Sequence, residues 1–289
     1  MDALQASSFL FVPGDRPDRF DKAASVADLA IIDLEDAVAA GNKPEARDAA
    51  AAWLRAGGHA AVRVNSAGTS WHQDDVSTMA GLTPVLVVPK MEAPHELGEV
   101  RRVVGDRLQL VALIETPRGV ANVRAICDAG ADRLALGNLD LAAELGVDPE
   151  SAALLWARGA LVYASAEAGL PGPIDGVTSA IRDDALLREE SLRARDLGFT
   201  GKLCIHPRQV GHVNRSFAVT DAELTWARGV VAAGTPGLES GVVTHDGHMV
   251  DAPVLRRAHG LLAREQASRD ARESPTSERD DGTDGSAAL

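Results

Sequence analysis

Two carboxylates in this sequence stand where a metal ion could be held. Glu115 follows the apolar run LQLVALI, and Asp140 follows RLALGNL. No histidine or cysteine stands beside either residue, and a pair of carboxylates favours a hard cation such as Mg²⁺, with water and substrate oxygens completing the octahedron. Each carboxylate has an alternative role as the cap of a following helix, because Asp140 precedes an apolar run and Glu115 precedes Thr116-Pro117.

Two basic residues also end apolar runs. Arg63 lies in AVRVN, and a buried arginine is rare without a partner. It would clamp a substrate carboxylate or polarise a carbonyl oxygen, or it would pair with Glu35 or Asp36; the two roles are compatible. Lys90 ends VLVVPK, where a lysine could form a Schiff base as in class I aldolases. The carboxylate pair favours the alternative, an ion-paired lysine near the site.

Weaker signals accompany these residues. The segment GDRP (14–17) opens a helical segment whose free N–H groups, together with Arg16 and Lys22, could hold phosphates. Asp175 lies in the run PIDGV. His206 ends KLCIHP, where we favour a binding role over acid–base catalysis.

Short apolar runs alternate with longer amphipathic segments. The runs are rich in Val, Ile and Leu and are often bounded by Gly or Pro, which is typical of strands buried on both faces. They span Ser8–Pro13, Leu29–Leu34, Ala60–Asn65, Val85–Lys90, Leu108–Glu115, Arg133–Gly137, Pro173–Val177 and Lys202–Pro207. The helical segments span Asp18–Ala27, Pro44–Leu54, Trp71–Ala80, Pro94–Val104, Pro117–Ala129, Ser151–Ala168, Asp184–Leu197 and Asp221–Ala233.

Eight strands, each followed by a helix, predict an α/β fold of the (β/α)₈ TIM-barrel type, with reactive groups at the C-terminal strand ends. An open doubly wound sheet is the alternative, but no GxGxxG follows the first run to favour it. Beyond this barrel (1–240) we predict a C-terminal lid (241–264). It consists of a hairpin over 241–251 that turns at Asp246-Gly247, and a helix over 252–264. The polar tail, 265–289, is predicted to be disordered.

Composition excludes several classes of function. The 289 residues include 29 basic and 42 acidic ones, a net charge of −13, and only 3% are aromatic. We therefore expect no binding of nucleic acid or anionic membrane. No apolar stretch reaches the roughly 20 residues that span a bilayer, and no signal peptide is apparent. Cys127 and Cys204 lie in apolar contexts and are expected to be buried thiols, so we expect a cytoplasmic protein.

Eight motifs occur in one order across residues 9–255. They are FVPGDRPDRFDKA, IIDLEDAV followed by KPEAR, RVN, VVPK, LIETPRGV, GNLDL, GFTGKLCIHPRQV and GHMVDAPVL. Together they resemble the citrate lyase β-subunit-like group of the HpcH/HpaI aldolase superfamily. The resemblance implies a Mg²⁺-dependent (β/α)₈ barrel that makes or cleaves C–C bonds in 3-hydroxyacyl thioesters such as malyl-CoA, citramalyl-CoA or citryl-acyl-carrier protein. It also implies a homotrimer or a dimer of trimers.

The resemblance assigns roles to individual residues. The metal ligands correspond to Glu115 and Asp140, the substrate-binding arginine to Arg63, and the acid of the second strand to Glu35. The acid/base residue of the lid corresponds to Asp251 in GHMVD, which relatives usually supply from a neighbouring subunit. The residues expected on the thioester nucleotide are Phe11, Arg16, Lys22, Ile174 and Asp175.

The implied reaction converts a 3-hydroxyacyl-CoA into acetyl-CoA and a 2-oxoacid such as glyoxylate or pyruvate, and stand-alone relatives also hydrolyse the thioester. One alternative is a citrate lyase β subunit that acts on citryl-acyl-carrier protein. Another is a non-catalytic acyl-CoA-binding barrel, which the retained carboxylates, Arg63 and Asp251 disfavour. The chain departs from the pattern at Leu139, where relatives often carry an acidic residue beside the metal ligand, and this bears on substrate preference.

Overall fold

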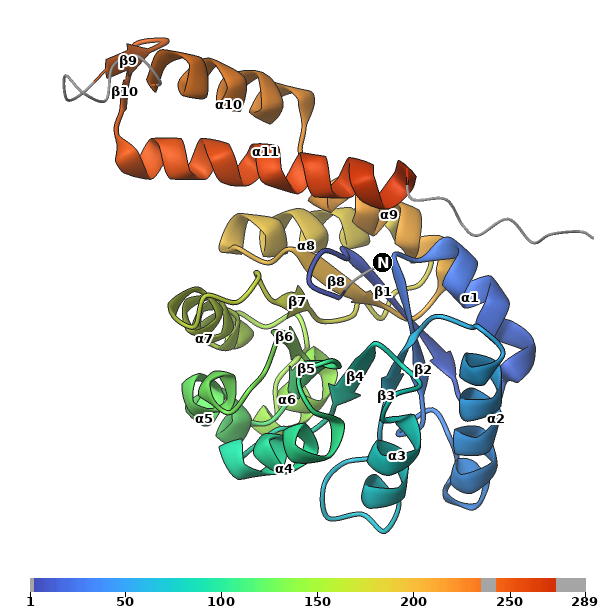
Figure 1. Ribbon diagram of the computed structural model, residues 1–289. Helices are drawn as coiled ribbons and strands as arrows, with labels where there is room; N and C mark the ends of the chain where they lie inside the picture. The colour runs from blue at the N-terminus through green and yellow to red at the C-terminus, as the bar shows by residue number, and fades with distance from the viewer. Residues whose placement is uncertain (1–2, 235–242, 274–289) are drawn as a thin grey trace, which may run out of the picture. The chain divides into compact units, whose positions relative to one another are not determined.

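Eight parallel strands close into a barrel in chain order (Figure 1). The computed structural model describes residues 3–234 and 243–273. The strands are β1 (Ser8–Pro13), β2 (Leu29–Asp33), β3 (Ala61–Arg63), β4 (Val85–Val88), β5 (Gln109–Ile114), β6 (Arg133–Leu136), β7 (Ile174–Asp175) and β8 (Gly201–Cys204). Because β1 pairs with both β2 and β8, the sheet closes on itself. The predicted barrel is confirmed, and the open doubly wound sheet is excluded.

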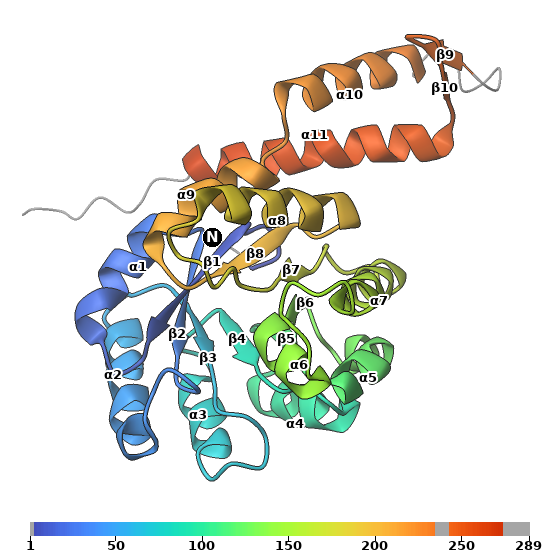
Figure 2. The same cartoon turned by 180° about the vertical axis from the view of Figure 1, so that it is seen from behind.

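Helices surround the strands on the outside, as Figure 2 shows from behind. They are α1 (Phe20–Val26), α2 (Lys43–Arg55), α3 (His72–Met79), α4 (Pro94–Val104), α5 (Pro117–Asp128), α6 (Asn138–Leu145), α7 (Leu154–Glu167), α8 (Asp184–Leu197) and α9 (Pro207–Phe217). Short 3₁₀ turns at Pro17–Arg19 and Ala40–Asn42 precede α1 and α2. Two of these helices, α6 and α9, were not predicted from the sequence.

The eighth barrel helix is α9, not the segment after residue 220. The sequence prediction assigned Pro207 to the last strand, whereas Pro207 is the first residue of α9, a position that tolerates a missing N–H. Val210, Val213 and Phe217 then recur at helical spacing and are buried.

Alternation along the strands decides which side chains line the barrel interior. One apolar cluster inside the barrel includes Phe9, Ile31, Ala61, Val87, Leu113 and Ile174. The residues that follow or precede them pack in the layer between strands and helices, among them Leu10, Ile32, Val62, Val88 and Ile114. Continued with a period of two, the same alternation places Phe11, Asp33, Arg63 and Glu115 on the interior side at the C-terminal strand ends. The fold therefore collects three of the candidates, Phe11, Arg63 and Glu115, at one mouth together with Asp33.

A second unit begins at Ala218. It contains α10 (Asp221–Gly234), the antiparallel hairpin β9 (Val243–His245) and β10 (His248–Val250), and α11 (Ala252–Glu273). The predicted turn is present: Asp246 and Gly247 have φ of 48° and 76°, as the two central positions of a type I′ turn require. The core of this unit is formed by Ala227, Val230, Val250, Leu255, Ala258 and Leu261.

Two predicted boundaries differ from the structure. The barrel unit ends at Phe217 rather than at 240, because α10 packs against α11 and belongs to the second unit. The last helix continues to Glu273, so the predicted disordered tail is wrong for residues 265–273; residues 274–289 lie outside the described residues. None of the described helices is both long and apolar enough to cross a bilayer. Cys127 and Cys204 are buried free thiols, as expected.

Candidate active site

Arg63 ends β3 at the barrel mouth, where acidic side chains that end or follow β2 surround its guanidinium. Its Nε and one terminal nitrogen donate to the two carboxylate oxygens of Asp33, each at 2.7 Å. The other terminal nitrogen lies 3.2 Å from Glu35 and 3.6 Å from Asp36. The ring of Phe11 lies 4.8 Å from its Cζ. The predicted ion pairs are confirmed, and the bidentate partner, Asp33, is one that the sequence did not single out.

Lys90 follows β4 and belongs to the same cluster. Its Nζ lies 2.8 Å from Glu35 Oε1 and 3.5 Å from Asp36 Oδ1. Burial alone would lower the pKa of Lys90, but the hydrogen bond and charge of Glu35, together with the charges of Asp36 and Glu115, raise it above its ordinary value. A lysine held in its protonated form is not the free amine that Schiff-base formation requires. The structure therefore supports the ion-paired alternative.

Glu115 follows β5 and is only 3% exposed. One of its oxygens accepts the backbone N–H of Lys90 at 2.7 Å. Lys90 has φ of 49°, a left-handed conformation that is uncommon for a residue with a side chain. Burial raises the pKa of Glu115 to about 8, with further contributions from the charges of Glu35 and Asp140 and opposition from Arg63. Within the described residues, no cation lies at ion-pair distance from this carboxylate, as a buried anion would need.

Asp140 lies in the first turn of α6, exposed, and close enough to Glu115 for its charge to raise the pKa of Glu115. The alternative that these two carboxylates are helix caps is wrong. The N-cap of α6 is Gly137. The N-cap of α5 is Thr116, whose hydroxyl accepts the N–H of Gly119 at 3.0 Å. Neither candidate ligand is therefore occupied by helix capping.

The charge and space at the mouth fit a divalent cation. Two cations, Arg63 and Lys90, face a larger set of carboxylates, which are Asp33, Glu35, Asp36, Glu115 and Asp140. Gly137 leaves room beside Glu115, because a Cβ at this position would overlap the Glu115 carboxylate. The described residues contain no group of three or more His, Cys, Asp or Glu side chains arranged around a metal position. A Mg²⁺ ion here would take two protein carboxylates and fill its other positions with water and substrate oxygens.

Two residues expected on the nucleotide are enclosed in the protein. Ile174 is fully buried in the barrel interior, and Asp175, the next residue, faces the helix layer. Both Asp175 oxygens are bonded, one to Arg158 Nε at 2.9 Å and the other to Lys202 Nζ at 2.8 Å. These cations hold the pKa of Asp175 below its ordinary value even though burial acts in the opposite direction. The side chain of Asp175 ties β7 to β8 and α7, so neither side chain reaches a ligand in this conformation.

Other candidates lie at the surface. Arg16 and Lys22 are exposed, and Arg16 forms a bidentate pair with Asp18 at 3.1 Å. His206 is exposed as well, and its Nδ1 accepts the N–H of Arg208 at 3.1 Å. Their exposure leaves them accessible to a large ligand, but no described contact joins them to the Arg63 cluster.

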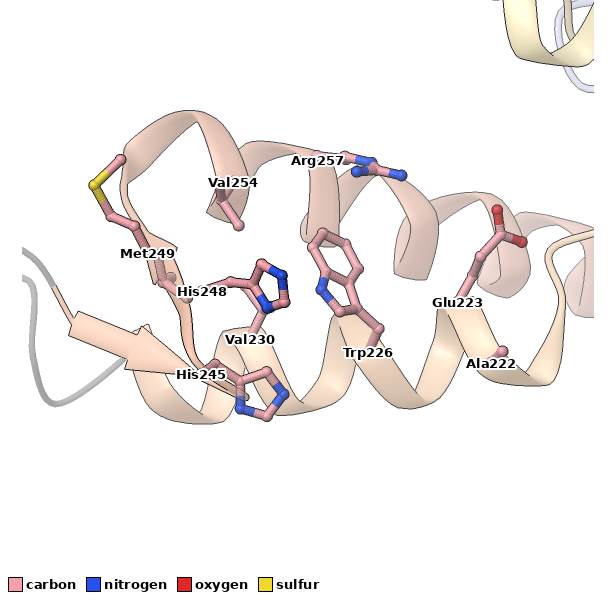
Figure 3. A pocket seen from close by; sticks show the side chains of 10 residues that line it. Ala222, Glu223, Trp226, Val230, His245, His248, Met249, Val254 and Arg257 are labelled. Atoms are coloured by element: carbon pink, nitrogen blue, oxygen red, sulfur yellow. The ribbon is translucent and has the colours of Figure 1, made fainter.

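Asp251 connects β10 to α11 in the second unit. Its Oδ1 accepts the N–H of Val254 at 3.1 Å, so Asp251 caps α11. A hollow of about 490 Å³ opens nearby between α10, the hairpin and α11. Figure 3 shows Trp226, His245 and His248 lining it, and Arg257 lies 4.9 Å from the Trp226 ring. All of its lining residues belong to the second unit, and none is a predicted site residue.

Residues 7–207 match the family model of the HpcH/HpaI aldolase/citrate lyase family. The chain belongs to this family. The resemblance inferred from the motifs is thereby confirmed, and the barrel mouth described above lies within the matched residues.

Relatives of known name extend the similarity beyond the barrel. A citrate lyase subunit beta-like protein of Deinococcus radiodurans is 34% identical over 275 residues, covering 89% of this chain and 96% of the relative. A (3S)-malyl-CoA thioesterase of Cereibacter sphaeroides is 34% identical, with 90% and 94% covered. The human mitochondrial citramalyl-CoA lyase is 30% identical, with 88% and 83% covered.

A solved structure of similar fold carries ligands. The chain superimposes on CitE of Mycobacterium tuberculosis in complex with magnesium, acetoacetate and coenzyme A, with a TM-score of 0.77. The two sequences are 33% identical, and the match covers 91% of this chain and 98% of the other. The magnesium, acetoacetate and coenzyme A belong to that protein.

The space beside Glu115 leads to a prediction for this family member. Gly137→Ala is expected to weaken Mg²⁺ binding by roughly 10- to 100-fold, because the new Cβ displaces the Glu115 carboxylate. Gly159→Ala on α7 is the matched control, since a Cβ there meets nothing within 4 Å. The control should bind Mg²⁺ normally, with unchanged or slightly higher Tm. Titration calorimetry measures both variants, and equal affinities would contradict the placement of the ion beside Glu115.

The raised pKa of Glu115 predicts how Mg²⁺ binding depends on pH. Below about pH 8 the metal-free carboxyl holds a proton that must leave before the ion binds. The dissociation constant should therefore increase by about tenfold for each pH unit below that value, and level off above it.

The stability of the metal-free protein should decrease as the pH rises, while its affinity for Mg²⁺ increases. A carboxyl whose folded pKa is raised contributes stability that is fully present at low pH and is lost as pH rises through about 8. Calorimetry and melting curves from pH 6 to 9 check both trends.

Proposed function

We propose that this chain is a Mg²⁺-dependent lyase that breaks a C–C bond of a 3-hydroxyacyl-CoA and releases acetyl-CoA and a 2-oxoacid. The observation that carries the proposal is the arrangement of charged side chains at the barrel mouth. Glu115 is a buried carboxylate to which the described part of the chain supplies no ion pair, and Arg63 is fixed nearby by two hydrogen bonds to Asp33. The names and ligands of the relatives support the substrate class, because they include CoA thioesters, a CoA lyase and magnesium.

Cleavage of such a thioester breaks the bond between the hydroxyl-bearing carbon and the carbon next to the thioester carbonyl. The hydroxyl group loses its proton and becomes the keto group of the oxoacid, and the departing carbon takes the electron pair and then a proton. Glu115 and Asp140 would hold Mg²⁺, which when bound supplies Lewis-acid stabilisation of the substrate oxygens. Arg63 places a fixed positive charge where oxygen charge develops, and its orientation needs no rearrangement during the reaction. The Glu35 carboxylate forms ion pairs with both Lys90 and Arg63 and so keeps these two side chains next to each other.

The proton for the departing carbon is assigned to Asp251. We propose that the second unit acts as a lid and that, in a homotrimer, Asp251 of one copy serves the barrel mouth of its neighbour. Phe11, Arg16 and Lys22 are proposed as contacts of the CoA nucleotide, supported by the exposure of the two basic side chains. A cytoplasmic location belongs to the same proposal, supported by the two buried free thiols.

A condensation screen tests the proposed function. Glyoxylate, pyruvate and other 2-oxoacids are incubated singly with acetyl-CoA or propionyl-CoA and Mg²⁺, and new 3-hydroxyacyl-CoA products are detected by mass spectrometry. The proposal predicts a product for at least one pair and none after EDTA treatment. Borohydride trapping of an oxoacid on Lys90 would instead indicate a Schiff-base enzyme.

A further inference from the structure

Lys43 is a buried lysine whose ammonium group donates its hydrogen bonds to the residues that directly follow β2 and β3. It begins α2 and is 8% exposed. Its Nζ donates to the carbonyl oxygens of Leu34 at 2.9 Å and Glu35 at 2.7 Å, and to Asn65 Oδ1 at 2.6 Å. An ammonium has three N–H groups, so these bonds occupy every donor of Lys43. Its hydrogen-bond partners are thus two backbone carbonyls and an amide, not a carboxylate.

The acceptor that follows β3, Asn65, is itself held in place. The backbone N–H and the Nδ2 of Asn65 both donate to Asp75 Oδ2, at 3.0 and 2.6 Å. Asp75 is fully buried and lies 3.3 Å from Arg47 on α2. The side-chain oxygen of Asn65 is thereby turned toward Lys43. Because Asn65 stands two residues after Arg63, the network joins the strand end that carries Arg63 to the strand end that carries Glu35.

The backbone of Glu35 is consequently held by hydrogen bonds at both its N–H and its carbonyl. Its N–H donates to Asp33 Oδ1 at 2.9 Å, and its carbonyl accepts from Lys43. Its side chain then spans Lys90 and Arg63, at 2.8 and 3.2 Å. Loss of the Lys43 ammonium would remove the described donor to the Leu34 carbonyl and leave the Glu35 carbonyl with only the more distant N–H of Val38, at 3.2 Å, in a buried position where an unpaired polar group is unfavourable. The backbone would shift to find another donor, and the carboxylate would move with it.

We infer that Lys43 is a positioning residue that aims the Glu35 carboxylate at Lys90 and Arg63 by holding the backbone after β2. The inference deepens the proposed function, and its kinetic consequence rests on that function. Lys43 acts through Glu35 and Asn65 and has no contact with the reacting atoms in this account. A purely structural lysine would affect stability alone, whereas a positioning lysine must also affect turnover in a way that depends on Glu35.

The test compares two buried lysines in the full-length protein. Lys43→Met removes the ammonium and keeps an unbranched side chain. Lys202→Met is the matched control, because Lys202 is 1% exposed and bonded to Asp175 on the helix-facing side of the barrel. Both variants should have lower Tm. Only Lys43→Met should lose kcat, by roughly 10²-fold, the scale expected for a misplaced catalytic group. Equal kcat values in the two variants would overturn the inference.

Coupling to Glu35 separates positioning from general damage. In a Glu35→Gln background, Lys43→Met should lower kcat by less than about threefold, because the carboxylate that it positions is already gone. The inference would be contradicted if Lys43→Met lowered kcat by the same factor with and without Glu35→Gln. Should Lys43→Met fail to fold, Asn65→Ala removes one partner of the ammonium and should show the same dependence on Glu35 with a smaller loss.

A structural measurement decides the inference even if the chain proves to have no lyase activity. In a crystal structure of Lys43→Met, the contact between Lys90 Nζ and Glu35 Oε1, 2.8 Å in this structure, should open beyond hydrogen-bonding distance. An unchanged contact would refute the role of Lys43 whatever the enzyme does. If the unmodified protein has no lyase activity but the contact opens in Lys43→Met, the proposed function is refuted and the positioning role of Lys43 stands.

Discussion

Replacement of Glu115 by Gln is expected to lower kcat by about 10³-fold or more and to remove the stabilisation that Mg²⁺ gives the protein. Charge stabilisation by a bound metal is worth several kcal/mol, and about 1.4 kcal/mol corresponds to a factor of ten. Gln keeps the shape of the side chain and its hydrogen bond from the Lys90 N–H, but supplies no charge to the ion. The loss should therefore appear without unfolding.

The same variant should melt at a higher temperature than the wild type when metal is absent and the pH is near 8.5. Burial raises the pKa of Glu115 to about 8, so its ionised form is unfavourable in the folded protein, and a neutral amide relieves that penalty. The measurements are kcat with saturating Mg²⁺ and melting curves with and without the ion. Glu45→Gln, at an exposed position on α2, is the control and should match the wild type. A Glu115→Gln protein that is still stabilised by Mg²⁺ would show that the ion binds elsewhere.

Replacement of Asp251 by Asn is expected to lower kcat by roughly 10²- to 10⁴-fold, the usual effect of losing a general acid or base. Stability should barely change, because Asn caps a helix about as well as Asp and the hydrogen bond to Val254 N–H is retained. The matched control is Asp183→Asn, since Asp183 caps α8 through the N–H of Leu186 at 2.9 Å. Both variants should keep the wild-type Tm, and only Asp251→Asn should lose activity. Normal kcat in Asp251→Asn would leave Asp251 with its capping role alone.

Mixing experiments then locate Asp251 relative to the site it serves. Asp251→Asn is expected to be slow and Glu115→Ala inactive, but oligomers re-formed from both would contain some sites with an intact lid residue and an intact metal ligand. Recovery of activity on mixing would place Asp251 over a neighbouring subunit. A slow Asp251→Asn variant without recovery would keep its role but place it within its own subunit.

The part of the site that could be predicted from sequence is the part fixed by strand register. A period of two along a buried strand makes the orientation of Arg63 and Glu115 follow from their apolar neighbours, and the strand ends meet at one mouth in a closed barrel. The same alternation, applied from Ile174, predicts that Asp175 faces the helices. Because β7 is only two residues long in the structure, the sequence offers little pattern there.

Other features depend on contacts between distant segments, which no local pattern reveals. Lys43 stands in a segment that reads as the start of an ordinary amphipathic helix, and its partner Asn65 is 22 residues away. The need for glycine at position 137 arises from Glu115, which follows β5, because a Cβ at position 137 would overlap the Glu115 carboxylate. α10 was counted with the barrel because its own periodicity cannot show that it packs against α11.

Product analysis with purified protein tests the central claim most directly. (3S)-Malyl-CoA and citramalyl-CoA are incubated separately with the protein and Mg²⁺, and the products are identified by mass spectrometry. We expect acetyl-CoA in amounts equal to the glyoxylate or pyruvate released, with no release after EDTA treatment and full recovery when Mg²⁺ is restored. Free CoA with the intact hydroxy acid, or cleavage that persists without a divalent cation, would contradict the central claim.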